Sequence, residues 1–244
     1  MIAQDIIKES LQNEKLRIAQ GRRDEIRRMV DYYTDCETSK YIIDHFNSQA
    51  FREIPPYSVN FTRRFINKMS RIYTLGADRN VSDEYLFLTR KKNARMKHIE
   101  RMTRLVGTIA NRVMVKEDAN GTFFEYRPIY YYNAFFDDDP FLPMAITYPL
   151  LLPVNDISET GKLEYAYWDD VHYAQYDEDG NITMQYEHGF GMLPFVFTHR
   201  EDQIDSHFVE GANDIVNVNE QVNITMTEMQ LGLRFQMFGQ PVTT

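Results

Sequence analysis

Residues 210–244, EGANDIVNVNEQVNITMTEMQLGLRFQMFGQPVTT, decide the architecture that this sequence predicts. Apolar side chains recur there at steps of three and four residues, which is the spacing of one helix face. The recurring residues are Ile215, Val218, Val222, Met226, Met229 and Leu233. Gly239 and Pro241 then end the predicted helix, because glycine tolerates a left-handed cap and proline cannot extend the hydrogen-bond ladder. A strand is expected to begin at Val242, and we expect the chain to be part of a longer protein.

The rest of this predicted helix is rich in side-chain amides rather than charges. The amides are Asn213, Asn217, Asn219, Gln221, Asn223, Gln230 and Gln236. A helix that faces open solvent usually carries lysine and glutamate pairs, whereas uncharged amides can pair across a boundary with other protein. We therefore expect this face to contact protein, and we name Asn219 and Asn223 as candidate subunit-interface residues.

Three stretches of the chain resemble the portal proteins of tailed bacteriophages. The first is a helix of the form D-I-x-x-x-N-x-x-x-N that runs into R-(Y/F)-x-x-(F/Y)-(G/A)-x-P-(V/L). The matching residues are Asp214, Ile215, Asn219, Asn223, Arg234, Phe235, Phe238, Gly239, Pro241 and Val242. The second, residues 59–80, resembles a portal helix that ends in an aromatic residue, a small turn and a loop. The third, residues 101–115, resembles the helix that leads into the portal wing sheet, and together the matches span residues 59–244.

The resemblance implies a structural protein rather than an enzyme. It implies a homo-oligomeric ring of twelve copies at one capsid vertex of the virion, assembled in the host cytoplasm. Double-stranded DNA would pass through the central channel during packaging and ejection. The implied partners are the major capsid protein, the terminase and the head-completion or adaptor proteins. No cofactor, metal or membrane is implied.

The charge of the chain is divided unequally along its length. Residues 1–116 hold 23 Lys and Arg against 14 Asp and Glu, a net charge of +9, whereas residues 117–244 hold 4 against 22, a net charge of −18. The basic face of one subunit could therefore meet the acidic face of the next, and a head-to-tail contact of that kind closes into rings. The alternative is that both halves are merely solvated, and for the arginines near residue 25 we favour that alternative. These are Arg22, Arg23, Arg27 and Arg28.

A helix that begins after Asn60 carries the basic face on which we base the interface prediction. Asn60 can cap this helix, and Phe61, Phe65 and Met69 lie on its apolar side. We expect the basic residues on its other side to meet an acidic neighbouring subunit. They are Arg63, Arg64, Lys68 and Arg71.

The pattern along the chain predicts an α+β fold. N-terminal helices with a break near Gly21 come first, in residues 1–53. Residues 54–205 are predicted to form an α+β wing-like domain, in which a helical stretch runs to Ala110 and antiparallel or mixed strands follow. Turns at Asn120-Gly121 and Asp179-Gly180 give strong hairpin patterns. Residues 206–244 form the long helix that leads toward a stem.

Catalytic and metal-binding patterns are weak throughout. Asp137, Asp138 and Asp139 precede a proline and are expected to form a turn rather than a cation site. The six histidines have no metal-ligand spacing, the single cysteine excludes an internal disulfide, and no run approaches the about 20 apolar residues that span a bilayer. Two alternatives stay open: a monomeric adaptor or scaffold that binds through the amide-rich helix, and a carboxylate-dependent nuclease. The nuclease would use Glu164, Asp169, Asp170 and Asp177.

Overall fold

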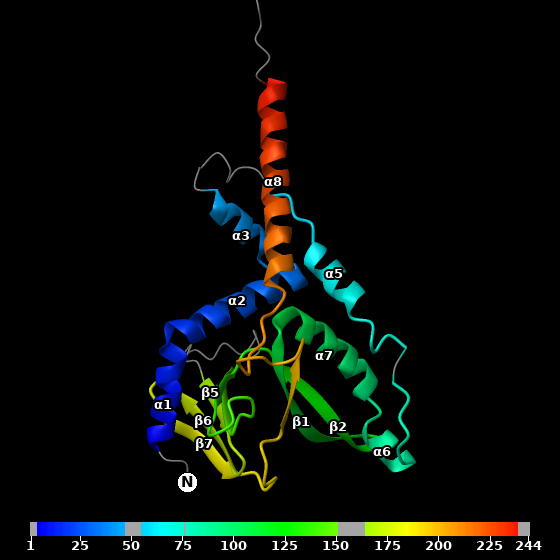
Figure 1. Ribbon diagram of the computed structural model, residues 1–244, viewed down its shortest axis with the longest axis vertical. Helices are drawn as coiled ribbons and strands as arrows, with labels where there is room; N and C mark the ends of the chain where they lie inside the picture. The colour runs from blue at the N-terminus through cyan, green and yellow to red at the C-terminus, as the bar shows by residue number, and fades with distance from the viewer. Residues whose placement is uncertain (1–3, 47–54, 76, 151–163, 239–244) are drawn as a thin grey trace, which may run out of the picture.

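The computed structural model describes residues 4–46, 55–75, 77–150 and 164–238, which form the α+β fold that the sequence predicts. In chain order the described helices are α1 (Gln4–Lys15), α2 (Arg17–Thr34), α3 (Thr38–His45), α5 (Phe61–Met69), α6 (Asp83–Leu88), α7 (Lys92–Val106) and α8 (Asn213–Phe238). Figure 1 shows a body of helices and sheets at one end, from which α8 projects along the long axis of the molecule.

Two antiparallel sheets make up the rest of the body. The first has the strand order β2–β1–β8, and the second has the order β3–β4–β5–β6–β7. The strands are β1 (Thr108–Asp118), β2 (Gly121–Ile129), β3 (Asn133–Phe135), β4 (Ala145–Leu150), β5 (Glu164–Trp168), β6 (His172–Asp177), β7 (Ile182–Glu187) and β8 (Phe195–His199). The predicted hairpin turns at Asn120-Gly121 and Asp179-Gly180 are confirmed, since they join β1 to β2 and β6 to β7.

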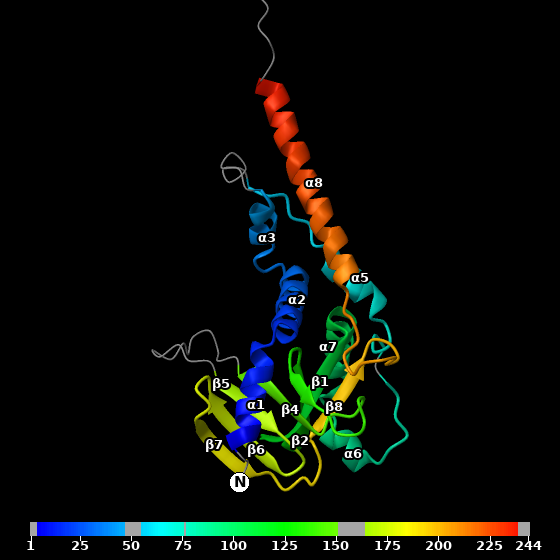
Figure 2. The same cartoon turned by 60° about the vertical axis from the view of Figure 1, so that its left-hand side comes forward.

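Aromatic residues fill the space between the two sheets. Trp168 of β5 packs against Tyr173 of β6 and against Phe195 of β8, so both sheets contribute to one core. The other face of the second sheet is covered by α1 (Figure 2). There the hydroxyls of Ser10 and Tyr176 share a buried hydrogen bond of 2.6 Å. The second sheet therefore lies between α1 and the first sheet.

A helical core lies against the first sheet and supports α8. It contains Ile26 of α2, Ile66 of α5, Leu105 of α7 and Val216 of α8, all of them buried. Further apolar residues of α7 belong to the same core. They are Ile99, Met102 and Val106. One core thus includes helices from all three predicted segments, and the predicted boundaries at residues 53 and 205 stay predictions.

Two glycines let the segment before α8 pass against the turn between α7 and β1. Gly107 has φ +95°, and a Cβ added there would lie 2.1 Å from the carbonyl oxygen of Val209. A Cβ on Gly211 would lie 2.6 Å from the carbonyl oxygen of Leu105. The Ala212 N–H donates to that same Leu105 oxygen at 2.8 Å. Close backbone packing therefore fixes the base of α8.

Two predicted helix boundaries are wrong. Helix α2 continues through Gly21, and the described helical segments are instead interrupted at Leu16 and at residues 35–37, where Asp35 and Glu37 have positive φ. The helix predicted to run to Ala110 ends at Val106. The backbone of Gly107 turns there, and β1 begins at the next residue.

Candidate subunit interface

Helix α5 is held against α8 by the side chain of Asn219. Asn219 Oδ1 accepts the backbone N–H of Phe61 at 2.6 Å and of Thr62 at 3.1 Å. These donors belong to the first turn of α5, which has no acceptors for them within the helix. Asn60 Oδ1 accepts the N–H of Arg63 at 2.8 Å, which confirms the predicted N-cap. The start of α5 thus depends on a residue that lies 158 positions away from Phe61.

The next turns of α8 continue this contact. Asn223 Oδ1 accepts the Val59 N–H at 2.9 Å, and Thr227 Oγ1 accepts the Tyr57 N–H at 3.0 Å. We call Asn219, Asn223 and Thr227 the polar ladder. All three are buried, and Asn223 is 0% exposed. We therefore correct the prediction that Asn219 and Asn223 meet a neighbouring subunit, because their partners lie within the same chain.

The apolar stripe predicted for α8 lies largely on its exposed side. Val218 is 64% exposed, and Met229 and Leu233 are also exposed. Val216 and Ile224, which lie outside the predicted stripe, are buried. The hydrophobic period correctly located the helix, but it did not indicate which side of the helix is buried. An apolar face of α8 is consequently left uncovered in the described chain.

An apolar groove of about 440 Å³ lies between α5 and α8. Phe61 and Phe65 line it from α5, and Ile215, Val218 and Val222 line it from α8. Phe65 is 53% exposed even though the sequence places it on the apolar side of its helix. Exposed apolar surface of this kind marks a contact site for another protein more often than a free surface.

The basic residues predicted for an interface are exposed, and they lie on α5, which lines this groove, or directly after it. They are Arg63, Arg64, Lys68 and Arg71. Within the ranges that the structure describes, none of the four forms an ion pair. Cations near α7 behave differently: Arg90 pairs with Asp118 at 2.7 Å, and Arg95 pairs with Glu125 at 2.8 Å. We call the four residues of α5 and its C-terminal flank, together with the groove, the basic face.

The other motif positions do not gather at one place. Asp214 lies in the first turn of α8 and lines the groove, and Ile215 packs against the helical core. Arg234 and Phe235 are exposed near the far end of α8, roughly 30 Å away along the helix axis. Gly239 and Pro241 lie outside the described residues.

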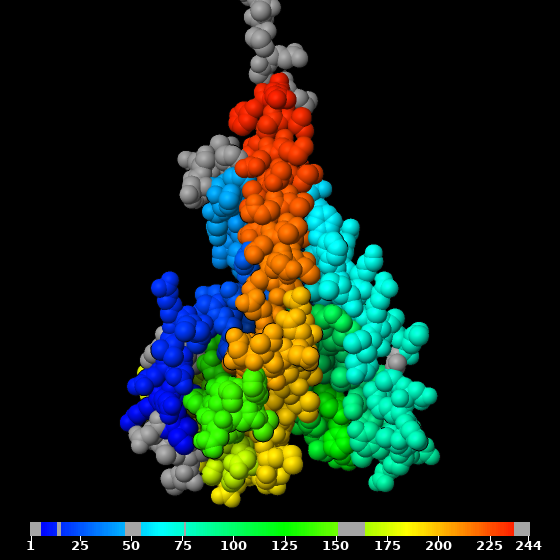
Figure 3. Space-filling model, in the orientation of Figure 1, coloured from blue at the N-terminus to red at the C-terminus, as the bar shows by residue number. Residues whose placement is uncertain are grey.

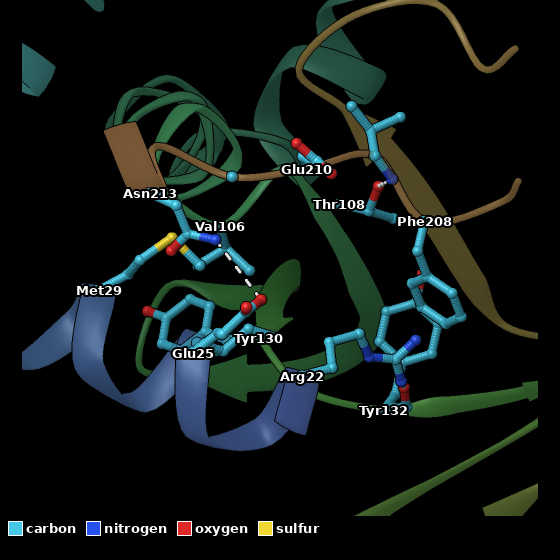
Figure 4. A pocket seen from close by; sticks show the side chains of 13 residues that line it. Arg22, Glu25, Met29, Val106, Thr108, Tyr130, Tyr132, Phe208, Glu210 and Asn213 are labelled. Carbon is cyan, nitrogen blue, oxygen red and sulfur yellow. Dashed lines mark hydrogen bonds between the residues drawn. The ribbon is translucent and has the colours of Figure 1, made fainter. Parts of the chain in front are cut away.

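Arg22 bridges α2 and the base of α8, next to a pocket of about 220 Å³ (Figure 4). Its guanidinium donates to the carbonyl oxygen of Tyr132 and, at 2.9 Å, to Asn133 Oδ1. The same group lies 3.6 Å from the centre of the Phe208 ring, which is cation–π geometry. Our expectation that Arg22 belongs to a merely solvated face is therefore wrong.

Arg28 makes a second bridge from α2 to α8. It pairs with Glu220 and donates at 2.8 Å to Asn217 Oδ1, so it too departs from the predicted solvated face. Across the pocket, Asn213 Nδ2 lies 3.4 Å from Glu25 Oε2 (Figure 4). These polar contacts fix the orientation of α8 relative to α2.

His207 ties the segment before α8 to the loop between β3 and β4. Its Nδ1 donates to the carbonyl oxygen of Phe141 at 2.9 Å, so Nε2 accepts from the Tyr132 hydroxyl at 2.7 Å. Burial lowers the pKa of His207 to about 4, and the nearby His199 and Arg22 act in the same direction while the Phe141 carbonyl opposes them. At neutral pH the imidazole of His207 is therefore uncharged, and this is the form that can donate from Nδ1 while it accepts at Nε2.

Two of the four carboxylates considered for a nuclease, Asp169 and Asp177, serve hairpin turns. Asp169 accepts the Val171 N–H at 2.8 Å, and Asp177 accepts the N–H groups of Asp179 at 3.0 Å and Asn181 at 2.8 Å. Among the described residues, no group of three His, Cys, Asp or Glu side chains could hold a metal ion. No described helix is long and apolar enough to cross a membrane.

Comparison with known proteins gives no family for this chain. No model of a known protein family matches it, and a search of curated proteins found no match.

Proposed function

We propose that this chain is a subunit of a bacteriophage portal. Copies of the chain would form a ring of about twelve at one capsid vertex, with a central channel for double-stranded DNA. The ring would dock the terminase during packaging and the head-tail connector proteins afterwards. The chain would carry out no bond chemistry of its own.

The observation that carries the proposal is the uncovered side of α8. A 26-residue helix projects from an α+β body, and its exposed stripe is apolar where a solvated helix would be charged (Figure 1). Neighbouring copies in a ring would cover that stripe. The order of the elements, with a short basic helix, a helix leading into a sheet and then a long helix, also accords with the portal resemblance.

The charge of the chain supports a conduit for DNA. The net charge is −9, and residues 117–244 alone hold 22 Asp and Glu against 4 Lys and Arg. A strongly basic channel would bind the phosphate backbone by counterion release and slow the movement of DNA. An acidic assembly repels the backbone and lets the DNA slide.

Both alternatives lose part of the support that motivated them. The adaptor hypothesis relied on the amide-rich side of the long helix, but Asn219 and Asn223 of that side are buried within the chain. The nuclease hypothesis relied on carboxylates of the second sheet, but Asp169 and Asp177 accept hydrogen bonds from their own turns.

Electron microscopy of the purified full-length protein tests the proposal. We expect closed rings with a central opening wide enough for double-stranded DNA. Compact monomers, or closed dimers without an opening, would contradict a portal function.

A further inference from the structure

Two neighbouring loops carry a second surface that combines charge with exposed apolar groups. They are residues 136–144, between β3 and β4, and residues 200–206, after β8. The hydrogen bond from His207 to the Phe141 carbonyl joins them, and the Phe136 ring also packs against His207. The exposed carboxylates of the two loops are Asp137, Asp138, Asp139, Glu201, Asp202 and Asp205. We call this surface the acidic lobe.

Apolar side chains protrude from the acidic lobe. Leu142 is 67% exposed, Ile204 is 88% exposed, and Phe141 beside them is also exposed. None of the six carboxylates forms an ion pair within the described part of the chain. Side chains as exposed as Ile204 gain nothing from folding of the chain itself, so a contact with another molecule is the way they can be buried.

The acidic lobe and the basic face occupy different parts of the surface. In Figure 3 the segment after β8, in gold, lies at the front of the molecule, and α5, in cyan, lies on its right-hand side. The basic face offers unpaired cations beside an apolar groove. The acidic lobe offers unpaired carboxylates beside protruding apolar side chains. The two surfaces are complementary in charge and in the placing of apolar groups.

We propose that the occupant of the basic face is the acidic lobe of a second copy of this chain. Leu142 and Ile204 of one copy enter the groove between α5 and α8 of the next, and the surrounding carboxylates pair with Arg64, Lys68 and their neighbours. The inference rests on the ring of the proposed function and names the two surfaces that build it. Because the surfaces differ, the contact is heterologous, and repeated rotation closes it into a ring. Opposite charges fix the register of such a contact. Repulsion between like charges disfavours a contact between two basic faces or between two acidic lobes.

A charge exchange between the two surfaces tests this pairing in the full-length protein. The variant Arg64→Glu/Lys68→Glu reverses the charge at two positions of the basic face, and the variant Asp138→Lys/Asp202→Lys reverses the charge at two positions of the acidic lobe. None of these four side chains has a hydrogen bond or ion pair in the described structure, so both variants should fold. We expect the ring fraction, measured by size-exclusion chromatography with light scattering, to fall at least tenfold for each variant alone. An equimolar mixture should restore rings in which the two variants alternate.

Controls separate a specific pairing from a general effect of charge. The variant Lys8→Glu/Arg17→Glu changes the net charge by the same amount on exposed residues near α1, and it should form rings as the wild type does. If each surface variant alone formed rings, or if the mixture formed none, the pairing would be overturned. The ring of the wild type, and with it the proposed function, would not be affected by either outcome. A wild type that never associates would overturn the proposed function and this inference together.

Discussion

Replacing Asn219 by alanine tests the link between α8 and α5 most sharply. The Asn219 oxygen is buried and accepts two backbone N–H groups at the start of α5, from Phe61 at 2.6 Å and from Thr62 at 3.1 Å. A buried donor left without a partner costs about 1–3 kcal/mol. The Phe61 N–H keeps a second acceptor, the Val59 carbonyl at 3.2 Å, so the Phe61 donor contributes less than the Thr62 donor to the loss of stability. We therefore expect Asn219→Ala to lower the free energy of unfolding by about 2–4 kcal/mol.

Urea denaturation at pH 7, followed by circular dichroism, measures this loss. The matched control is Gln221→Ala, which removes an exposed amide from the same helix and should change the free energy of unfolding by less than about 0.5 kcal/mol. A thermal scan of both variants gives a second reading that does not depend on extrapolation to zero denaturant. Equal stabilities for the two variants would refute the claim that the polar ladder holds α5 in place.

Three further outcomes follow from the geometry. Gly107→Ala should lower the free energy of unfolding by more than about 3 kcal/mol, because its Cβ would meet the Val209 carbonyl and its φ is positive; a fall of under 1 kcal/mol in thermal denaturation would contradict this. The pKa of His207 is lowered from 6.5 to about 4 by folding, so its contribution is complete above pH 6.5 and is lost as the pH falls toward 4. Between pH 8 and pH 5 this loss should be about 2 kcal/mol in the wild type and absent in His207→Gln, as measured by urea titrations at both pH values. Val218→Asp changes an exposed groove residue and should leave unfolding within about 0.5 kcal/mol of wild type while abolishing ring formation; unaltered rings would argue against the groove as a contact.

Sequence reasoning succeeded where the stabilising contact lies within a few residues. Asn60 caps α5 as predicted, because its side chain accepts the N–H three residues ahead, and Ser82 caps α6 with the same geometry. The Asn120-Gly121 turn sets the register of the first hairpin, and this contact is local as well. Local chemistry of this kind can be seen in any short window of the sequence.

The sequence could not reveal which side of α8 is buried. The apolar stripe suggested one side, yet the polar ladder lies on the buried side because residues 57–62 present backbone N–H groups to it. Those donors belong to an irregular segment and the first turn of a helix more than 150 positions away, and no periodicity records them. Asn219 and Asn223 do pair with protein, as the amide-rich pattern predicts, but their partner is the chain itself.

The candidate interface was predictable in part. The exposure of Arg64 and Lys68 follows from the amphipathic pattern of their helix. The acidic lobe cannot be seen in the sequence, because its two loops are separated by more than 50 residues and are joined by the hydrogen bond from His207 to the Phe141 carbonyl. The run of Asp137, Asp138 and Asp139 before Pro140 predicts a turn, and nothing in that pattern indicates a surface that a distant loop completes.

Native mass spectrometry of the full-length protein at moderate ionic strength tests the central claim most directly. The account predicts one dominant closed assembly of about twelve copies. This assembly should lose subunits as the salt concentration rises, because salt screens the ion pairs between the basic face of one copy and the acidic lobe of the next. A monomer at every protein concentration, or a dimer as the largest species, would contradict it.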